Sequence, residues 1–250
     1  ILFMHPVQEP TIVDLFAGAG GISEGFRQMG FRPIAASDID PDACATYQLN
    51  FPAAKVVHGD VRDKNVAREL LEASRGVDVV VGGPPCQAFS QVRNHVRIID
   101  DPRNSLYKEF VHIVGEVLPK AFVMENVTGI DQMGFREQIV SDLELGGEYM
   151  VMPQVIDAAD VGAPQTRKRL IFIGVRKSLG IAAPLVHQSG VTRFLSLQRT
   201  LKRGKCKYTL EADDELTAHW LRPLQDPENL DAVSAVQAIG GLRALEAGNR

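Results

Sequence analysis

The residues "TIVDLFAGAGGISEGF", Thr11–Phe26, join a short β-branched run, a glycine-rich segment and an amphipathic stretch. The run Thr11–Phe16 predicts a buried strand, and Gly21–Met29 predicts a helix. Glycines between a strand and a helix let the backbone turn tightly and approach a ligand closely. The same alternation recurs along the chain, with apolar runs at Ile34–Ser37, Lys55–His58, Val77–Val81 and Ala121–Met124, and helix-like stretches at Asp42–Asn50, Asn65–Ala73 and Asn104–Leu118.

Strands that alternate with helices form parallel βαβ units, so we expect a doubly wound, Rossmann-like α/β sheet with ligands at the carboxyl ends of its strands. Two later runs, Tyr149–Ile156 and Arg169–Val175, have no long helix between them and predict a closing pair of strands. Beyond about residue 182 the alternation fades. The sequence therefore predicts one domain over residues 1–182 and a more variable region over 183–250.

Composition excludes several classes of protein. No stretch approaches the ~18 apolar residues of a membrane helix, and no signal peptide is visible, so we expect no membrane partner. Cys44, Cys86 and Cys206 lie far apart and form no CxxC pair, which argues against a disulfide framework and a zinc site. We therefore expect no metal and a reducing, cytoplasmic location. The net charge of −4 does not by itself indicate nucleic-acid binding.

Two carboxylates follow the predicted strands. Asp38 comes 20 residues after Gly18, where a carboxylate can bind a ribose diol, and Asp60 in "HGDV" reaches the same edge. The glycines follow a G-x-G-G spacing with Ser23 where a dinucleotide fingerprint has its third glycine, so the NAD motif fails. A solvated loop carboxylate is the alternative for Asp60. Together these features predict a nucleoside ligand without a pyrophosphate.

The stretch "GGPPCQAFS", Gly82–Ser90, places Cys86 on a stiff turn at the end of a strand. A lone cysteine is usually a small buried hydrophobe, but such a residue does not need this mounting. A nucleophilic thiol has a free pKa of about 8.5 and needs a cation or a base beside it. Because His95 is nine residues away, we discount a cysteine protease.

Charged residues also stand at the ends of two later runs. Glu125 in "VMENV" ends an apolar strand, where a partly desolvated carboxylate can donate a proton or hydrogen bond; a loop acid is the alternative. In "QTRKRLIFIGV", Arg167 and Arg169 share one face of a strand. Such cations are usually solvated, but two arginines on one side can clamp a substrate or a phosphate.

These segments, in this order, resemble the cytosine-5 DNA methyltransferase family. "DLFAGAGGISEGF" is similar to its first motif, "SDID" to its second, "GD" to its third, "GGPPCQAFS" to its fourth, "ENV" to its sixth and "QTRKRLIFIGV" to its eighth. The resemblance covers Thr11–Arg176 and implies an S-adenosylmethionine-dependent catalytic domain that modifies double-stranded DNA, as the modification enzyme of a restriction-modification system. An ordered set of motifs is more specific than any one of them.

The resemblance also implies roles for single residues. Cys86 attacks C6 of a flipped-out cytosine, Glu125 acts on N3, and Arg167 and Arg169 hold the base. The implied cofactor-binding residues are Phe16, Ala17, Gly18, Gly20, Gly21, Asp38, Ile39, Asp60, Val61, Pro84 and Leu106. The implied DNA-binding residues are Gln87, Ser90, Arg93 and Arg97.

The chain departs from the family pattern at its end. The ninth and tenth motifs and a full target-recognition domain are not found in the sequence, so we expect a second polypeptide or a longer chain to supply them. Two alternatives stay open: a transfer-RNA cytosine-5 methyltransferase, and a non-catalytic DNA-binding regulator with the same fold. In a bacterial host we expect the protein to associate with the nucleoid.

Overall fold

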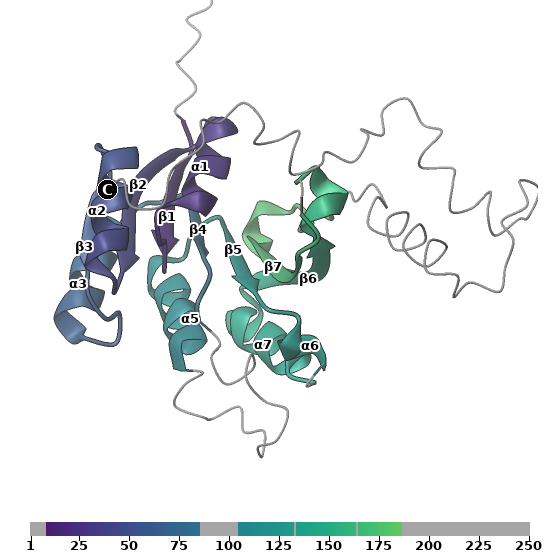
Figure 1. The fold of residues 1–250 in the computed structure, drawn as a ribbon. Coiled ribbons are helices and arrows are strands. Elements are labelled where there is room, and N and C mark those ends of the chain that lie inside the picture. Colours follow the sequence, from purple (N-terminus) through teal and green to yellow (C-terminus); the bar gives the residue numbers. More distant parts are fainter. Residues whose placement is uncertain (1–8, 86–104, 133, 164, 187–250) are drawn as a thin grey trace, which may run out of the picture. The chain divides into compact units, whose positions relative to one another are not determined.

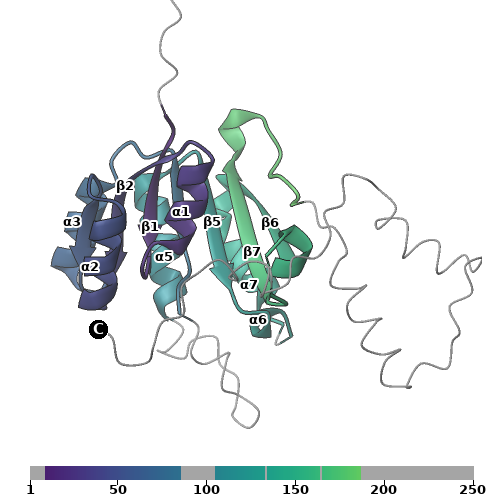
Figure 2. The same ribbon diagram turned by 45° about the horizontal axis from the view of Figure 1, so that its top comes forward.

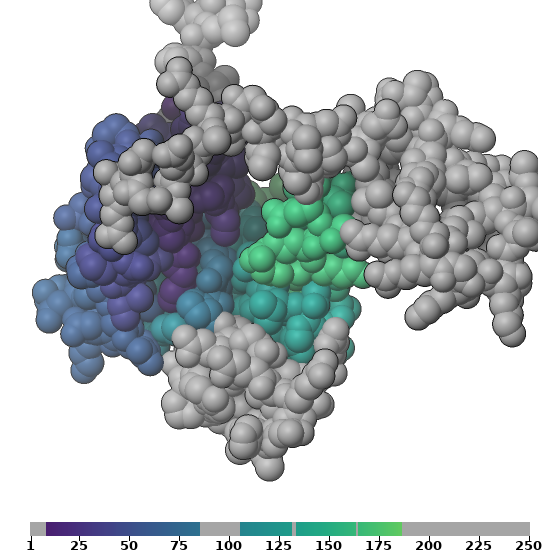
Figure 3. All heavy atoms as spheres, viewed as in Figure 1, coloured from purple at the N-terminus to yellow at the C-terminus, as the bar shows by residue number. Residues whose placement is uncertain are grey.

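The computed structural model describes residues 9–85, 105–132, 134–163 and 165–186, which are coloured in Figure 3. The chain divides into two units, Ile1–Gln154 with Leu170–Leu185, and Val155–Arg169 with Val186–Arg250. The boundary expected near residue 182 stays a prediction, because 187–250 lie outside the described residues. Within the described ranges, no helix has the length and apolarity to span a membrane.

The sheet has seven strands in the order β3-β2-β1-β4-β5-β7-β6 (Figure 1). Neighbours from β3 to β5 pair in parallel, whereas β7 pairs antiparallel with β5. This confirms the predicted α/β sheet and its closing pair of strands. The bounds are β1 (Thr11–Leu15), β2 (Arg32–Asp38), β3 (Lys55–His58), β4 (Val79–Gly82), β5 (Ala121–Asn126), β6 (Tyr149–Asp157) and β7 (Lys168–Arg176).

Helices cover both faces of the sheet (Figure 2). On one face lie α1 (Gly21–Gln28) and α2 (Pro41–Asn50), and on the other α3 (Lys64–Ala73) and α5 (Ser105–Val117). Ile22 and Phe26 of α1 pack against a buried cluster of β1 and β4. On the opposite face the Phe110 ring of α5 lies 6.1 Å from that of Phe122. Helices between parallel strands therefore bring the carboxyl ends of β1 to β5 to one edge.

Two differences from the predicted elements have local causes. β4 begins at Val79 rather than Val77, because the Val77 N–H donates to the Ser74 carbonyl (3.2 Å) and closes the turn after α3. Between β5 and β6 the structure also has two helices that the sequence did not predict, α6 (Gly129–Gln132) and α7 (Arg136–Leu143). Helix α7 buries only Ile139 and Leu143, a pair four residues apart, so its apolar pattern is weak. Short 3₁₀ turns lie at Leu145–Gly147, Ala158–Val161 and Lys177–Leu179.

Candidate active site

The turn between β1 and α1 has an unusual backbone. Phe16, Gly18 and Gly20 have φ of 58°, 54° and 93°, and a non-glycine residue in this region costs about 1–3 kcal/mol. A side-chain carbon at Gly20 would lie 2.4 Å from the Phe51 ring, so packing requires glycine there. At Gly18 and Gly21 that carbon would have no atom within 4 Å. The described residues therefore leave open space beside the turn for a ligand.

Asp38, at the end of β2, is tied to this turn. Its Oδ2 accepts the Gly18 N–H (2.8 Å) and its Oδ1 accepts the Asp40 N–H (2.9 Å). The next side chain, Ile39, is 63% exposed and presents apolar surface at the same edge. Of the other predicted cofactor residues, Phe16, Ala17 and Gly20 lie between β1 and α1, and Gly21 begins α1. Leu106 is half-buried in the first turn of α5.

Asp60 follows β3, and the Gly59 N–H donates to the Asp38 carbonyl (2.9 Å), which brings the two carboxylates to one edge. The Arg62 guanidinium binds both Asp60 oxygens, with Nε 2.9 and 3.0 Å away and Nη2 2.5 Å from Oδ2. These hydrogen bonds hold the pKa of Asp60 below its usual range. Val61 is buried. A ligand amino group at Asp60 would therefore share the carboxylate with Arg62.

Small residues bring the ends of β4, β1 and β5 into close contact. A side-chain carbon at Gly82 would lie 2.5 Å from the Leu15 carbonyl oxygen, so β4 needs glycine beside β1. The corresponding carbon at Gly83 would lie 3.2 Å from Glu125 Oε2. The Glu125 carboxylate therefore lies against the backbone that leads to the two prolines. This gives a packing reason for both glycines of "GGPPC".

The Asn126 side chain holds the backbone at Pro84 in place. Asn126 is 3% exposed, and its side-chain amide donates to the Pro84 carbonyl (3.2 Å), while its Oδ1 accepts the Val127 N–H (2.8 Å). Pro84 is itself buried. The chain is thus positioned up to Pro85, one residue before Cys86. The predicted nucleophile and the predicted DNA contacts lie outside the described residues: Cys86, Gln87, Ser90, Arg93 and Arg97.

The two predicted arginines belong to the second unit. Asp157 Oδ1 accepts the backbone N–H of Arg167 (3.0 Å), and the Arg167 carbonyl accepts the Ala158 N–H (3.0 Å). The Arg169 guanidinium donates to the Lys168 carbonyl (2.8 Å). Because Glu125 belongs to the first unit, the joint action of these arginines with Glu125 stays a prediction.

A chain of buried polar side chains, which the sequence motifs did not predict, lies beneath the turn. Asp14 in β1 is fully buried, its Oδ2 accepts the Ser23 hydroxyl (2.7 Å), and Ser23 Oγ lies 2.7 Å from the Tyr47 hydroxyl. Burial raises the pKa of Asp14 to about 7. Its Oδ1 has no hydrogen-bond partner among the described residues. Two features of the sequence could have indicated these contacts. Asp14 is an acid within an apolar strand, and Ser23 stands where a dinucleotide fingerprint has its third glycine.

The sequence is similar to those of known proteins. The family model for C-5 cytosine-specific DNA methylase matches residues 10–221. Type II methyltransferase M.XorII of Xanthomonas oryzae is 42% identical over 70% of this chain and 42% of that protein. M1.HphI of Haemophilus parahaemolyticus is 44% identical over 70% of this chain and 48% of that protein. M.AquIA of Picosynechococcus is 38% identical over 67% of this chain and 73% of that protein.

Solved structures share the fold. A protein encoded within an E. coli prophage and described as a DNA modification methyltransferase has a TM-score of 0.58 and 36% identity, over 70% of this chain and 49% of that chain. S. pombe Dnmt2 methyltransferase has a TM-score of 0.55 at 19% identity, over 74% and 54%, which is a likeness of fold alone. The present chain spans less than half of the first two relatives. Because the family model covers well over half of its residues, the chain belongs to the C-5 cytosine-specific DNA methylase family.

Proposed function

We propose that this protein transfers a methyl group from S-adenosylmethionine to C5 of cytosine in double-stranded DNA, as the modification enzyme of a restriction-modification system. The observation that carries the proposal is the Glu125 carboxylate against Gly83, three residues before Cys86, at the sheet edge that also holds the glycine turn. The family's description and the relatives named Type II methyltransferases support DNA as the substrate. They also support a place in a bacterial cytoplasm.

The residues at the ends of β1, β2 and β3 fit this cofactor. Space beside Gly18 and Gly21 lets a ligand approach the backbone. Each Asp38 oxygen accepts one backbone hydrogen bond and keeps a lone pair for a ribose hydroxyl. Ile39 offers apolar surface to an adenine ring, and Asp60 an acceptor for its amino group. When bound, the cofactor supplies an electrophilic methyl group.

The chemistry then rests on Cys86 and Glu125. The target base must leave the duplex, because neither ring carbon can be attacked inside the stack. The Cys86 thiolate forms a bond to C6, and Glu125 protonates or hydrogen-bonds N3, so that electron density reaches C5 rather than staying as charge on the ring. C5 would then take the methyl group as the methyl–sulfur bond of the cofactor breaks, which leaves a neutral thioether. Loss of the C5 proton to a base then restores the double bond and expels the thiolate.

Contacts to DNA are proposed from two segments. Gln87, Ser90, Arg93 and Arg97 follow the nucleophile directly and supply polar and cationic groups for phosphates and for the vacated base position. Arg167 and Arg169 hold the base through their guanidinium groups. Because the chain carries a net charge of −4, we expect its own affinity for DNA to be low and to fall with salt.

We further propose that residues beyond these 250 supply sequence recognition, either from a second polypeptide or from a longer chain. The support is that the matched segment of this chain covers only 42% and 48% of the length of the first two relatives. The test is to assay site-specific methylation by residues 1–250 alone and then with the downstream polypeptide. Full site-specific activity from residues 1–250 would contradict the proposal.

The nucleophile is tested with DNA that contains 5-fluorocytosine, which traps the covalent complex because the fluorine at C5 cannot leave as a proton does. Cys86→Ala should abolish the complex seen on a denaturing gel, along with transfer of tritiated methyl groups. Cys206→Ala, at a cysteine far from the predicted motifs, is the control and should keep both the covalent complex and the methyl transfer. A complex that survives Cys86→Ala places the nucleophile elsewhere.

The two alternatives are separated by the same labelled cofactor. Label in transfer RNA and not in DNA, with the active assembly, would favour the RNA methyltransferase. Unchanged DNA retention by Cys86→Ala, with no turnover of the wild type on either nucleic acid, would favour the regulator.

A further inference from the structure

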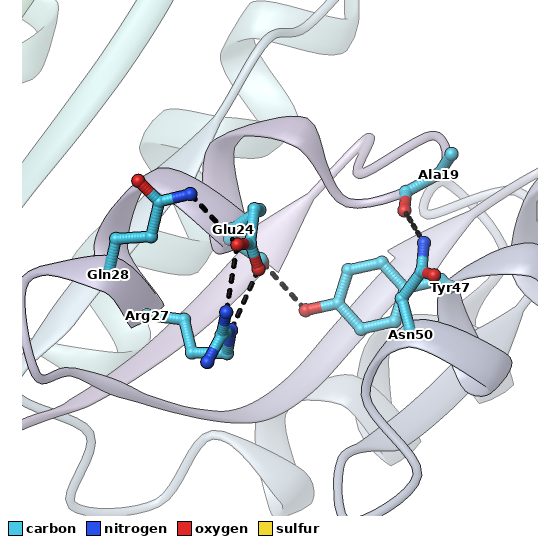
Figure 4. Close-up of polar contacts among 7 residues, drawn as sticks. Ala19, Glu24, Arg27, Gln28, Tyr47 and Asn50 are labelled. Atoms are coloured by element: carbon cyan, nitrogen blue, oxygen red, sulfur yellow. Dashed lines mark hydrogen bonds and ion pairs between the residues drawn. The ribbon is translucent and has the colours of Figure 1, made fainter. Parts of the chain in front are cut away.

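Helix α2 contacts the glycine turn through Asn50, a residue outside the predicted motifs. Asn50, the last residue of α2, donates its side-chain amide to the Ala19 carbonyl (2.9 Å), although the two are 31 residues apart. Ala19 stands between Gly18 and Gly20, which both have positive φ. Figure 4 shows the Asn50 and Tyr47 side chains beside the turn and the start of α1. The hydrogen bond therefore joins α2 to the turn at its centre.

The inner side of the turn rests on two rings of the same helix end. The Tyr47 and Phe51 rings are 4.7 Å apart, and a side-chain carbon at Gly20 would lie 3.0 Å from Tyr47 Cδ2. Tyr47 is 1% exposed, and its hydroxyl bonds to Ser23 in α1. The rings thus pack beneath Gly20, whereas the Ala19 carbonyl accepts its hydrogen bond from Asn50.

A neighbouring acid does not compete for the Asn50 amide. Glu24 in the first turn of α1 accepts hydrogen bonds from Arg27 Nε (2.7 Å) and Nη2 (2.9 Å) and from Gln28 (2.9 Å), as Figure 4 shows. The Arg27 hydrogen bonds lower the pKa of Glu24 to about 2, so the carboxylate stays charged and paired. Ala19, Glu24 and Asn50 line one hollow of about 460 Å³.

We propose that Asn50 is a positioning residue for cofactor binding, which holds the Ala19 carbonyl and so keeps the glycine turn in the conformation that receives S-adenosylmethionine. The inference rests on the proposed function. Glycines on both sides of Ala19 give the untethered turn many alternative conformations. When only a fraction of molecules has the competent conformation, the apparent dissociation constant rises by the inverse of that fraction.

The test compares three single variants of the active assembly, which is the 250-residue chain together with the downstream polypeptide. Asn50→Ala removes the hydrogen bond, and Asn50→Asp keeps the shape but replaces the amide donor with a carboxylate that cannot donate when ionised. Gln48→Ala is the matched control: it also removes a side-chain amide from α2, but that amide bonds to the carbonyls of Phe51, Pro52 and Ala54 rather than to the turn.

Two measurements are needed. In calorimetry with S-adenosylmethionine, both Asn50 variants should bind roughly threefold to tenfold more weakly than wild type, the size expected for one hydrogen bond, and Gln48→Ala within twofold of wild type. Without cofactor, amide hydrogen exchange of residues 17–20 should be faster in both Asn50 variants only.

The outcomes separate the inference from the proposed function. Equal effects of Asn50→Ala and Gln48→Ala on affinity and exchange, or full affinity in Asn50→Asp, would overturn the inference while leaving the function intact. A wild-type assembly that binds no cofactor would contradict the proposed function and the cofactor role of Asn50 with it, even if exchange at the turn still depended on Asn50.

Discussion

Asp14→Asn should change how the stability of the protein depends on pH. Burial raises the pKa of Asp14 from 3.8 to about 7, so the folded state favours the neutral acid. The neutral form of Asp14 therefore contributes stability that is fully present below about pH 4, and this contribution is lost as the pH rises through about 7. Each pKa unit corresponds to about 1.36 kcal/mol, so the two units from pH 5 to 7 correspond to about 3 kcal/mol.

The asparagine introduced by Asp14→Asn cannot ionise. The free energy of unfolding of the wild type minus that of the variant should therefore fall by about 3 kcal/mol between pH 5 and pH 8. Urea denaturation at four pH values measures both terms. Gln48→Ala is the control, because it removes no ionisable group, and its difference should stay flat. A flat difference for Asp14→Asn as well would refute the reasoning that burial keeps Asp14 neutral.

Two other substitutions test the neighbouring contacts. Asp38→Ala should weaken S-adenosylmethionine binding tenfold to a hundredfold in calorimetry, since charge-assisted hydrogen bonds contribute about 1.5–3 kcal/mol each; unchanged affinity would make Asp38 a loop acid. Gly82→Ala should lower the free energy of unfolding by about 1–3 kcal/mol, because its new carbon would lie 2.5 Å from the Leu15 carbonyl oxygen. Gly25→Ala, a helical glycine with no atom within 4 Å of that position, should instead add up to about 1 kcal/mol, and equal losses in both variants would contradict the packing argument.

The sequence predicted the fold well because its signals are local. A β-branched run followed by glycines and an amphipathic stretch predicts one βα unit, and repetition of that unit requires a parallel sheet. From there, the meeting of Asp38 and the glycine turn follows from the rule that parallel strands end at one edge. The sequence did not predict elements that bury few residues. Helix α7, which buries only Ile139 and Leu143, is an example.

The contacts that were missed depend on tertiary packing. Nothing local to Asn50 indicates that its amide reaches Ala19, and the burial of Asp14 and Ser23 becomes visible only when α1 and α2 are placed on the sheet. The same holds for Glu125, which the sequence placed at the end of a strand but not against Gly83. Motifs therefore predicted which residues reach the site, while the residues that hold them in place came from the packed structure.

These supports change how a loss of affinity at Asp38 must be interpreted. Its Oδ2 already holds the Gly18 N–H at 2.8 Å, so Asp38→Ala removes a support of the turn together with the proposed ribose contact. Asn50 supports the next residue, Ala19, without being assigned any contact to ribose. Comparing the cofactor with an analogue that lacks the ribose hydroxyls separates the two effects. If Asp38 binds the ribose, loss of the hydroxyls should reduce affinity less in Asp38→Ala than in wild type, whereas Asn50→Ala should weaken both ligands by the same factor.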